Sequence, residues 1–237
     1  LVRYYDNNNF YREPVVTGEL TVSGDVAQEL EKTSELIRFP SAIFPGPYTL
    51  SQLATDEYYG SETSFLEAMG EFVQGEVNAF PDINHLILLE PSLSFNPPST
   101  EHKEIFLKSI EEIKNTLKEE IVIQTYWGTF DREVYSDLLE LDVGIGFDFV
   151  TEVESNLALL NELGSPKTAS IGVVNGQNTN VESFGEVKEI VDRVIETGAD
   201  IQNVIVNSNT GLFYLPENKF TEKLGVLGSF VKNEGGL

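Results

Sequence analysis

The sequence predicts an α/β fold of parallel strands covered by helices, closed into one (β/α)8, TIM-type barrel spanning residues 1–237. Short apolar segments alternate with amphipathic helical segments along the whole chain, which is typical of parallel βα units. The length of 237 residues is close to the about 250 residues usual for such barrels. An open doubly wound sheet is the alternative. The regular spacing, and the lack of the glycine-rich phosphate loop that often marks such sheets, favour the barrel.

Seven segments are expected to form strands because they are short and mostly apolar, and two of them carry continuously apolar runs at residues 86–89 and 204–206. A closed barrel of this class has eight strands. The eighth is expected either at Val15–Val22 or upstream of Leu1, since a first residue other than Met fits a start inside a longer gene product. The seven predicted strands are Val2–Tyr5, Ser41–Phe44, His85–Leu89, Ile121–Thr125, Val143–Phe149, Thr168–Val174 and Asn203–Val206.

The segments between the strands have apolar residues at the three- and four-residue spacing of one helix face. Ser64 and Glu67 have the spacing of a capping box at a helix start, and Gly198 is placed to end a helix in a left-handed conformation, as is Gly164. The predicted helices are Ser64–Phe80, Glu101–Glu120, Glu182–Thr197, one that ends at Asn161–Gly164 and a last one carrying Phe220, Leu224, Leu227 and Val231.

Composition narrows the possible functions. With 15 basic and 39 acidic residues the formal charge is −24, which repels phosphate backbones and anionic lipids, so neither nucleic acid nor a membrane is expected as a partner. The chain has no cysteine, which excludes disulfides, thiolate nucleophiles and Cys-ligated metals. It has neither an apolar run of about 18 residues nor a signal-peptide pattern, and we expect a cytoplasmic protein.

Polar and aromatic residues follow most of the predicted strands, at the carboxyl ends where β/α barrels carry their chemistry. Each residue taken alone has a simpler explanation as a turn former or a cap. Together they predict a ligand site at one rim of the barrel. The candidate ligand-binding residues are Asp6, Asn7, Tyr48, Thr49, Glu90, Tyr126, Trp127, Asp148, Asn175, Asn178 and Asn209.

Six of these segments, in order and in register from Arg3 to about Leu224, resemble motifs of the N-terminal barrel of the cobalamin-independent methionine synthases. They are Arg3–Tyr11 followed by Pro14, Pro45–Thr49, Leu89–Leu93, Thr125–Gly128, Gly172–Asn178 and Asn209–Leu212. The resemblance implies that the family's first strand would lie before Leu1. It also implies a role in methionine biosynthesis with methyl-tetrahydrofolate as a possible ligand.

The same resemblance implies that this chain binds no metal. The family's catalytic barrel holds zinc through His, Cys, Glu and a second Cys, and this zinc activates the homocysteine thiol. At the matching positions the chain has Thr125–Trp127, Asp148, and Asn209 or Thr210. Zinc is therefore expected only on a separate catalytic barrel, with this chain helping to bind methyl-folate and to position that partner. Leu89 also replaces an Asp of the family, which weakens the expectation of an ordinary amino-acid site.

Two other functions stay open at this point. One is a metal-free, diverged enzyme of the same superfamily, which includes the uroporphyrinogen decarboxylases, with Glu90 and Asp148 as acid and base. The other is a non-catalytic scaffold barrel. For the folate hypothesis, Tyr4, Tyr48, Tyr126 and Trp127 are expected to stack on the pterin ring, whereas the near-absence of basic residues at the strand ends disfavours a polyglutamate tail.

Overall fold

The computed structural model describes residues 2–3, 10–11, 13–37 and 40–234. The chain divides into two compact units, unit 1 (Leu1–Ile121) and unit 2 (Val122–Leu237), and each is described by itself.

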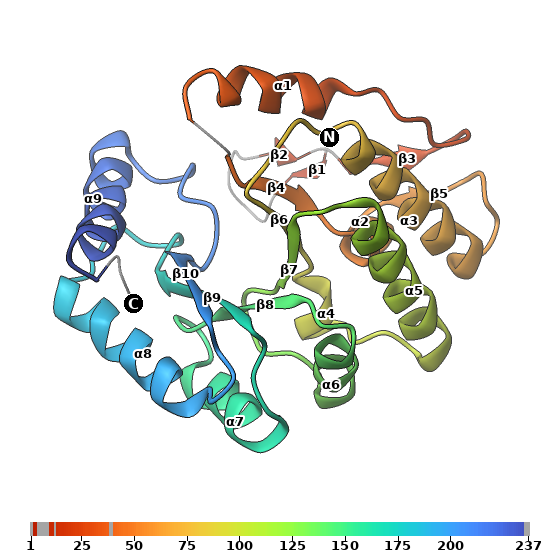
Figure 1. The fold of residues 1–237 in the computed structure, drawn as a ribbon. Helices are drawn as coiled ribbons and strands as arrows, with labels where there is room; N and C mark the ends of the chain where they lie inside the picture. Colours follow the sequence, from red (N-terminus) through yellow and green to blue (C-terminus); the bar gives the residue numbers. More distant parts are fainter. Residues whose placement is uncertain (1, 4–9, 12, 38–39, 235–237) are drawn as a thin grey trace. The chain divides into compact units, whose positions relative to one another are not determined.

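Unit 1 is built around two parallel strands that pair from Ala42↔Leu86 to Pro45↔Leu89. The central residues of the second strand are buried because this segment is continuously apolar. Two long helices lie side by side over this region (Figure 1), and Phe65 and Val73 of one helix and Phe106 and Ile110 of the other are fully or almost fully buried. The elements are α1 (Asp25–Ser34), β4 (Ala42–Pro45), α2 (Pro47–Leu53), α3 (Glu62–Asn78), β6 (His85–Leu89), α4 (Ser92–Phe95) and α5 (Thr100–Thr116).

Two short strand pairs complete the described part of unit 1. β1 (Val2–Arg3) pairs antiparallel with β2 (Phe10–Tyr11), so the expected parallel strand at Val2–Tyr5 is not formed by its described residues. β3 (Val15–Val16) pairs with β5 (Thr55–Asp56) in a separate two-stranded sheet. The prediction that Val15–Val22 supplies an eighth barrel strand is therefore wrong, because only its first two residues are extended and paired.

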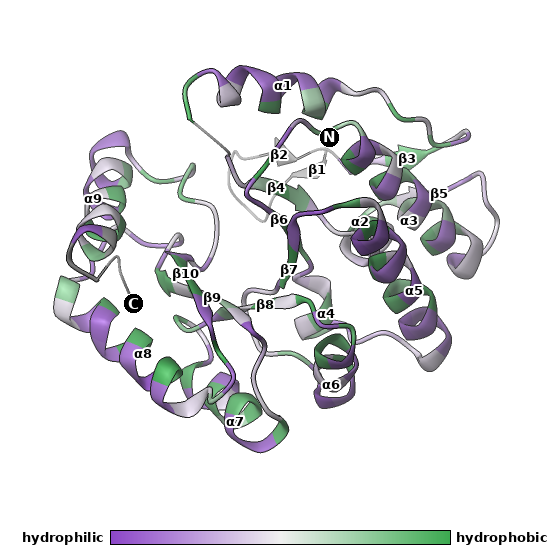
Figure 2. Ribbon diagram, viewed as in Figure 1, coloured by the Kyte–Doolittle hydropathy of each residue, from purple (hydrophilic) through white to green (hydrophobic). Residues whose placement is uncertain are grey.

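Unit 2 contains four parallel strands with helices between them, in the order expected for βα units. Ile145 pairs with Ala169 and Ile205 with Ser170, so neighbouring strands follow the chain order. Figure 2 shows hydrophilic and hydrophobic residues alternating along α8, whose residues Val187, Val191 and Val194 are buried. The elements are β7 (Glu120–Gln124, which begins at the end of unit 1), α6 (Arg132–Glu140), β8 (Gly144–Asp148), α7 (Val153–Leu163), β9 (Thr168–Val174), α8 (Phe184–Thr197), β10 (Asn203–Ser208) and α9 (Glu217–Glu234).

Some predicted helix ends are wrong. Helix α3 is capped by Ser61, whose side chain accepts the Ser64 N–H, so Ser64 is not the cap. The helix expected to reach Glu120 ends at Thr116, and Glu120 already belongs to β7. Gly198 has a φ of −90° and makes no left-handed cap.

The predicted class of α/β fold with parallel strands is confirmed. Besides the short parallel pair β3–β5, the described residues form six parallel strands, two in unit 1 and four counted with unit 2, and do not complete an eight-stranded barrel. Within the described part of the chain, every helix is too short or too polar to span a bilayer.

Candidate functional site

In unit 1 the carboxyl ends of β4 and β6 meet at Glu90. Its side chain is fully buried, and its two carboxylate oxygens accept the N–H groups of Tyr48 (3.0 Å) and Thr49 (2.6 Å) at the start of α2. Gly46 makes this approach possible, because a Cβ at that position would lie 2.1 Å from Glu90 Oε1. Glu90 is thus the buried acceptor for the first turn of α2.

Burial dominates the electrostatics of this group. It raises the pKa of Glu90 from 4.5 to about 7 against the opposing effect of the hydrogen bonds from Thr49 and Tyr48. Burial, followed by the nearby charge of Glu90, raises the pKa of Tyr48 to about 12. The Tyr48 hydroxyl donates to the carbonyl of Asn96 at 2.7 Å. Tyr48, Thr49 and Glu90 therefore form one buried structural cluster, and contact between any of them and a ligand stays a prediction.

In unit 2 the corresponding group is centred on Asp148, the last residue of β8, which is also fully buried. Its Oδ2 accepts the Trp127 N–H at 2.7 Å and the Thr151 hydroxyl at 2.8 Å. Its Oδ1 accepts the N–H groups of Val150 (2.9 Å) and Thr151 (3.0 Å), and Asn209 Nδ2 lies 3.1–3.2 Å from both oxygens. These bonds join the carboxyl ends of β7, β8 and β10 through one carboxylate.

Trp127, directly after β7, has the geometry most suggestive of a binding role. Its backbone is left-handed, with φ 64°, a conformation that costs a bulky residue about 1–2 kcal/mol. The hydrogen bond to Asp148 holds it there, and the side chain is 50% exposed. The Tyr126 ring packs edge-on against the indole, with centroids 4.8 Å apart and an angle of 88°. Strained residues often mark functional sites, and the Tyr126–Trp127 pair offers an exposed aromatic surface.

Asn209 connects this group to the loop after β9. Its Oδ1 accepts the Gly176 N–H at 3.0 Å, and the neighbouring Asn175 N–H donates to Glu182 at 2.9 Å. Glu182 in turn pairs with the fully buried Lys223 of α9, with both oxygens within 3.0 Å of Nζ. The Asn178 side chain accepts only a local N–H, that of Asn180, and lies on an exposed turn outside this network.

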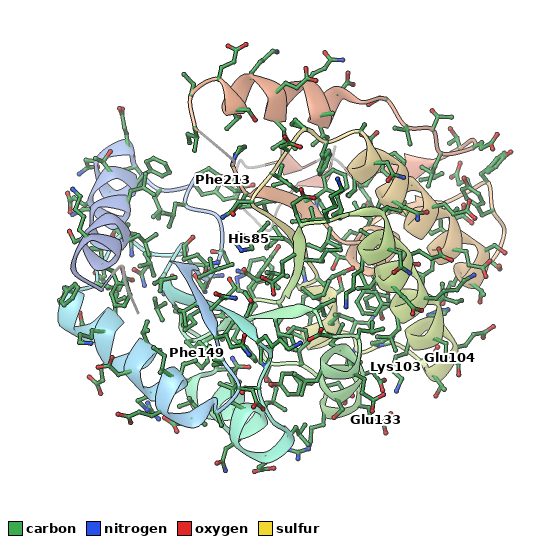
Figure 3. The ribbon with its side chains drawn as sticks, viewed as in Figure 1. His85, Lys103, Glu104, Glu133, Phe149 and Phe213 are labelled. Carbon is green, nitrogen blue, oxygen red and sulfur yellow. The ribbon has the colours of Figure 1, made fainter. Side chains whose placement is uncertain are left out.

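A second aromatic pair lies on the loop between β10 and α9. Phe213 (Figure 3) and Tyr214 are 74% and 87% exposed, with ring centroids 4.5 Å apart. Large apolar side chains exposed together are a common feature of interaction surfaces.

The residues in place do not fit a zinc ion. The chain has no cysteine, and the oxygens of Asp148 already face five hydrogen-bond donors. No cluster of three or more potential metal-ligating His, Cys, Asp or Glu residues occurs in the described part of the chain.

The structure thus gathers the described candidate residues, apart from Asn178, into two groups, one in each unit. Tyr4, Asp6 and Asn7 lie outside the described residues. Sequence reasoning missed Gly46, Thr151, Glu182 and Lys223. Of these four residues, only Lys223 could have been recognised as buried from the sequence. It stands three residues after Phe220 and four before Leu227, on the apolar face of α9.

Comparison with known proteins relates this chain to one family. Residues 1–198 match the family described as cobalamin-independent synthase, N-terminal domain. A 5-methyltetrahydropteroyltriglutamate–homocysteine methyltransferase of Lactococcus lactis subsp. cremoris (strain SK11) is 26% identical over 96% of this chain and 31% of its own length. The methionine synthase of Sulfolobus acidocaldarius is 23% identical over 92% of this chain and 64% of its own length.

A solved structure has the same fold. The B12-independent methionine synthase from Shewanella sp. W3-18-1, in complex with selenomethionine, superposes with a TM-score of 0.78 at 16% identity, covering 93% of this chain and 70% of that one. The chain therefore spans about a third of the length of the Lactococcus relative and about two thirds of the Sulfolobus one.

Proposed function

Since the chain belongs to the family of cobalamin-independent synthase N-terminal domains, we propose that it works in methionine biosynthesis as part of a methionine-synthase-type methyltransferase. In this proposal it helps to bind a methyl-folate and positions a separate catalytic barrel. The transfer of the methyl group to homocysteine is then an activity of the assembly.

The observation that carries the proposal is the Tyr126–Trp127 surface. A pterin is a flat ring system, and an exposed indole fixed at the carboxyl end of a strand is a suitable surface for stacking it. Asp148 accepts a hydrogen bond from the Trp127 backbone N–H and so fixes the position of this residue. The indole side chain of Trp127 takes no part in that bond and stays available for a ligand.

The zinc that activates homocysteine would belong to the partner. In this chain Asp148 lies where the resemblance places a zinc-ligating Glu, and it is saturated by donors. The exposed Phe213–Tyr214 pair is a suitable contact for a partner barrel, because aromatic residues are enriched in interface cores. An acid–base role for Glu90 and Asp148 is less well supported, since both carboxylates are fully buried and hydrogen-bonded.

Calorimetric titration with 5-methyltetrahydrofolate monoglutamate tests the proposal. Trp127→Ala is expected to weaken binding by about tenfold or more, since stacking of a base on an aromatic side chain contributes about 1–3 kcal/mol. Tyr58→Ala is the matched control, because Tyr58 is also half exposed and ring-paired but lies on the turn after β5. The proposal fails if the parent chain shows no saturable binding, or if both variants lose affinity equally.

A further inference from the structure

A pocket of about 340 Å³ lies in unit 1, where the segment that follows β3, the turn that follows β5 and helix α3 come together (Figure 1). The pairing of β3 with β5 brings the first two of these segments side by side. They supply Leu20, Tyr58 and Tyr59 to its lining, and α3 supplies Phe72. The volume of this Tyr58 pocket falls in the range of about 300–1,000 Å³ that is usual for sites of small molecules.

Hydrogen bonds fix the walls of the Tyr58 pocket. The Asp56 carboxylate accepts the N–H groups of Tyr58 and Tyr59, each at 2.9 Å, and that of Gly60 at 2.8 Å. The Tyr59 hydroxyl in turn accepts the Leu20 N–H at 2.9 Å. Both tyrosines are therefore held by neighbours within the protein, and such preorganisation lowers the entropy lost when a ligand binds.

The aromatic rings of the pocket present faces to a ligand. The rings of Tyr58 and Tyr59 form a corner, with an angle of 86° and centroids 5.0 Å apart, and Tyr59 is also stacked on Phe65. Tyr58 is 52% exposed. The face of an aromatic ring is partly negative and attracts a cation that lies within about 6 Å of its centre. The rings of Tyr58, Tyr59 and Phe72 in one pocket thus favour a positively charged ligand.

The charged residues that line the Tyr58 pocket are all acidic. They are Glu19 and Glu71, both exposed, and no Lys, Arg or His is among the described residues of the lining. Residues 13–31 and 40–84, which contain the whole lining, have five and seven acidic residues respectively and no Lys, Arg or His. The pocket therefore attracts cations and repels anions.

We infer that the Tyr58 pocket binds a small quaternary ammonium compound, with its trimethylammonium group against the three rings and its charge balanced by Glu19 and Glu71. A quaternary ammonium ion has no N–H donor, so aromatic faces can replace its hydration without leaving a polar group unpaired. A primary ammonium has three donors to satisfy, and the Tyr59 hydroxyl oxygen already accepts the Leu20 N–H. The site shares no residue with the Tyr126–Trp127 surface, so it is a second binding function beyond the proposed one.

Calorimetric titration of the 237-residue chain with choline tests this site. The neutral isostere 3,3-dimethylbutan-1-ol has the same shape without the charge, and ethanolamine has the charge without the methyl groups. Choline is expected to bind saturably and about tenfold or more tighter than either of them. The reason is that only choline combines a charge that the rings and carboxylates attract with methyl groups that fill the apolar lining.

Substitutions separate the contribution of the rings from that of the charges. Tyr58→Leu keeps an apolar side chain but loses the aromatic face, and is expected to weaken choline binding by about threefold or more, whereas Tyr58→Phe should bind within about twofold of the parent chain. Glu71→Gln is also expected to weaken binding by about threefold. Glu111→Gln is the matched control and should leave binding unchanged, because Glu111 is exposed on α5 of the same unit but does not line the pocket.

Several results would overturn the inference. A lack of saturable choline binding does so, as does equal binding of choline and its neutral isostere, because the charge would then play no part. Tighter binding of ethanolamine than of choline excludes the quaternary ammonium as the preferred class. Equal affinities of Tyr58→Leu and Tyr58→Phe would show that the ring is not used, and equal losses in Glu71→Gln and Glu111→Gln would assign the attraction to the net charge of the chain. None of these results changes the outcome of the methyl-folate titration, so the two proposals fail separately.

Discussion

Replacement of Asp148 by Asn is expected to destabilise unit 2 by about 3 kcal/mol and to release Trp127 from its left-handed conformation. The carboxylate faces five donors, and an Asn side chain has only one accepting oxygen for them. In either amide orientation at least one backbone N–H loses its acceptor, which costs about 1–3 kcal/mol when the group is buried. The remaining bonds also lose their charge-assisted character, at about 1 kcal/mol or more in total.

The single tryptophan makes this effect measurable. Urea unfolding followed by Trp127 fluorescence gives the free energy, and near-ultraviolet circular dichroism reports the packing of Tyr126 against the indole. Asp142→Asn is the control, because Asp142 also has a positive φ of 53° but is exposed and pairs with Lys167 at the surface, so less than about 1 kcal/mol is expected. A loss below about 1 kcal/mol for Asp148→Asn, with an unchanged dichroism spectrum, would refute the positioning role.

Three further predictions concern the buried Glu90 carboxylate, the glycine that packs against it, and the buried Lys223–Glu182 ion pair. The pKa of Glu90 is about 7 in the folded protein and 4.5 in the unfolded chain. Its contribution to the free energy of unfolding is therefore fully present below about pH 4.5 and falls by about 3 kcal/mol as the pH rises through 7. The destabilisation caused by Glu90→Gln, measured by urea unfolding, should therefore be smaller at pH 8 than at pH 5. Gly46→Ala should cost about 2 kcal/mol because its Cβ would displace the Glu90 carboxylate, whereas Gly18→Ala, with open space around it, should change the melting temperature little. Lys223→Ala should cost about 2–3 kcal/mol by leaving Glu182 unpaired, and a double-mutant cycle with Glu182→Gln should give a coupling above about 1 kcal/mol.

The central strands were predictable because their residues are buried on both faces. His85–Leu89 and Thr168–Val174 have the predicted bounds, since a continuous apolar run leaves little choice of conformation. The N-terminal segments were less predictable. Val15–Val16 pairs with Thr55–Asp56, a contact between residues far apart in the chain that no local pattern encodes.

Helix starts were ambiguous for a related reason. Ser61 and Ser64 stand three residues apart, and both have the chemistry of a cap. In the structure Ser61 is the N-cap of α3. Its backbone is extended, with φ −148°, and its side chain accepts a hydrogen bond from the Ser64 N–H. The Ser183–Glu186 capping box of α8 follows the same chemistry and was visible in the sequence, although the helix was expected to begin at Glu182.

The sequence by itself determined that this chain is an α/β protein of the methionine-synthase type, with no cysteine and with aromatic and acidic residues following its strands. Those properties depend on composition and on the order of apolar and polar residues. Only the tertiary structure decided which of the polar residues bind one another. Glu90 and Asp148 look alike in the sequence as candidate ligands, yet the fold directs backbone donors at both carboxylates and leaves Trp127 exposed, because the partners of a buried charge come from segments that only folding brings together.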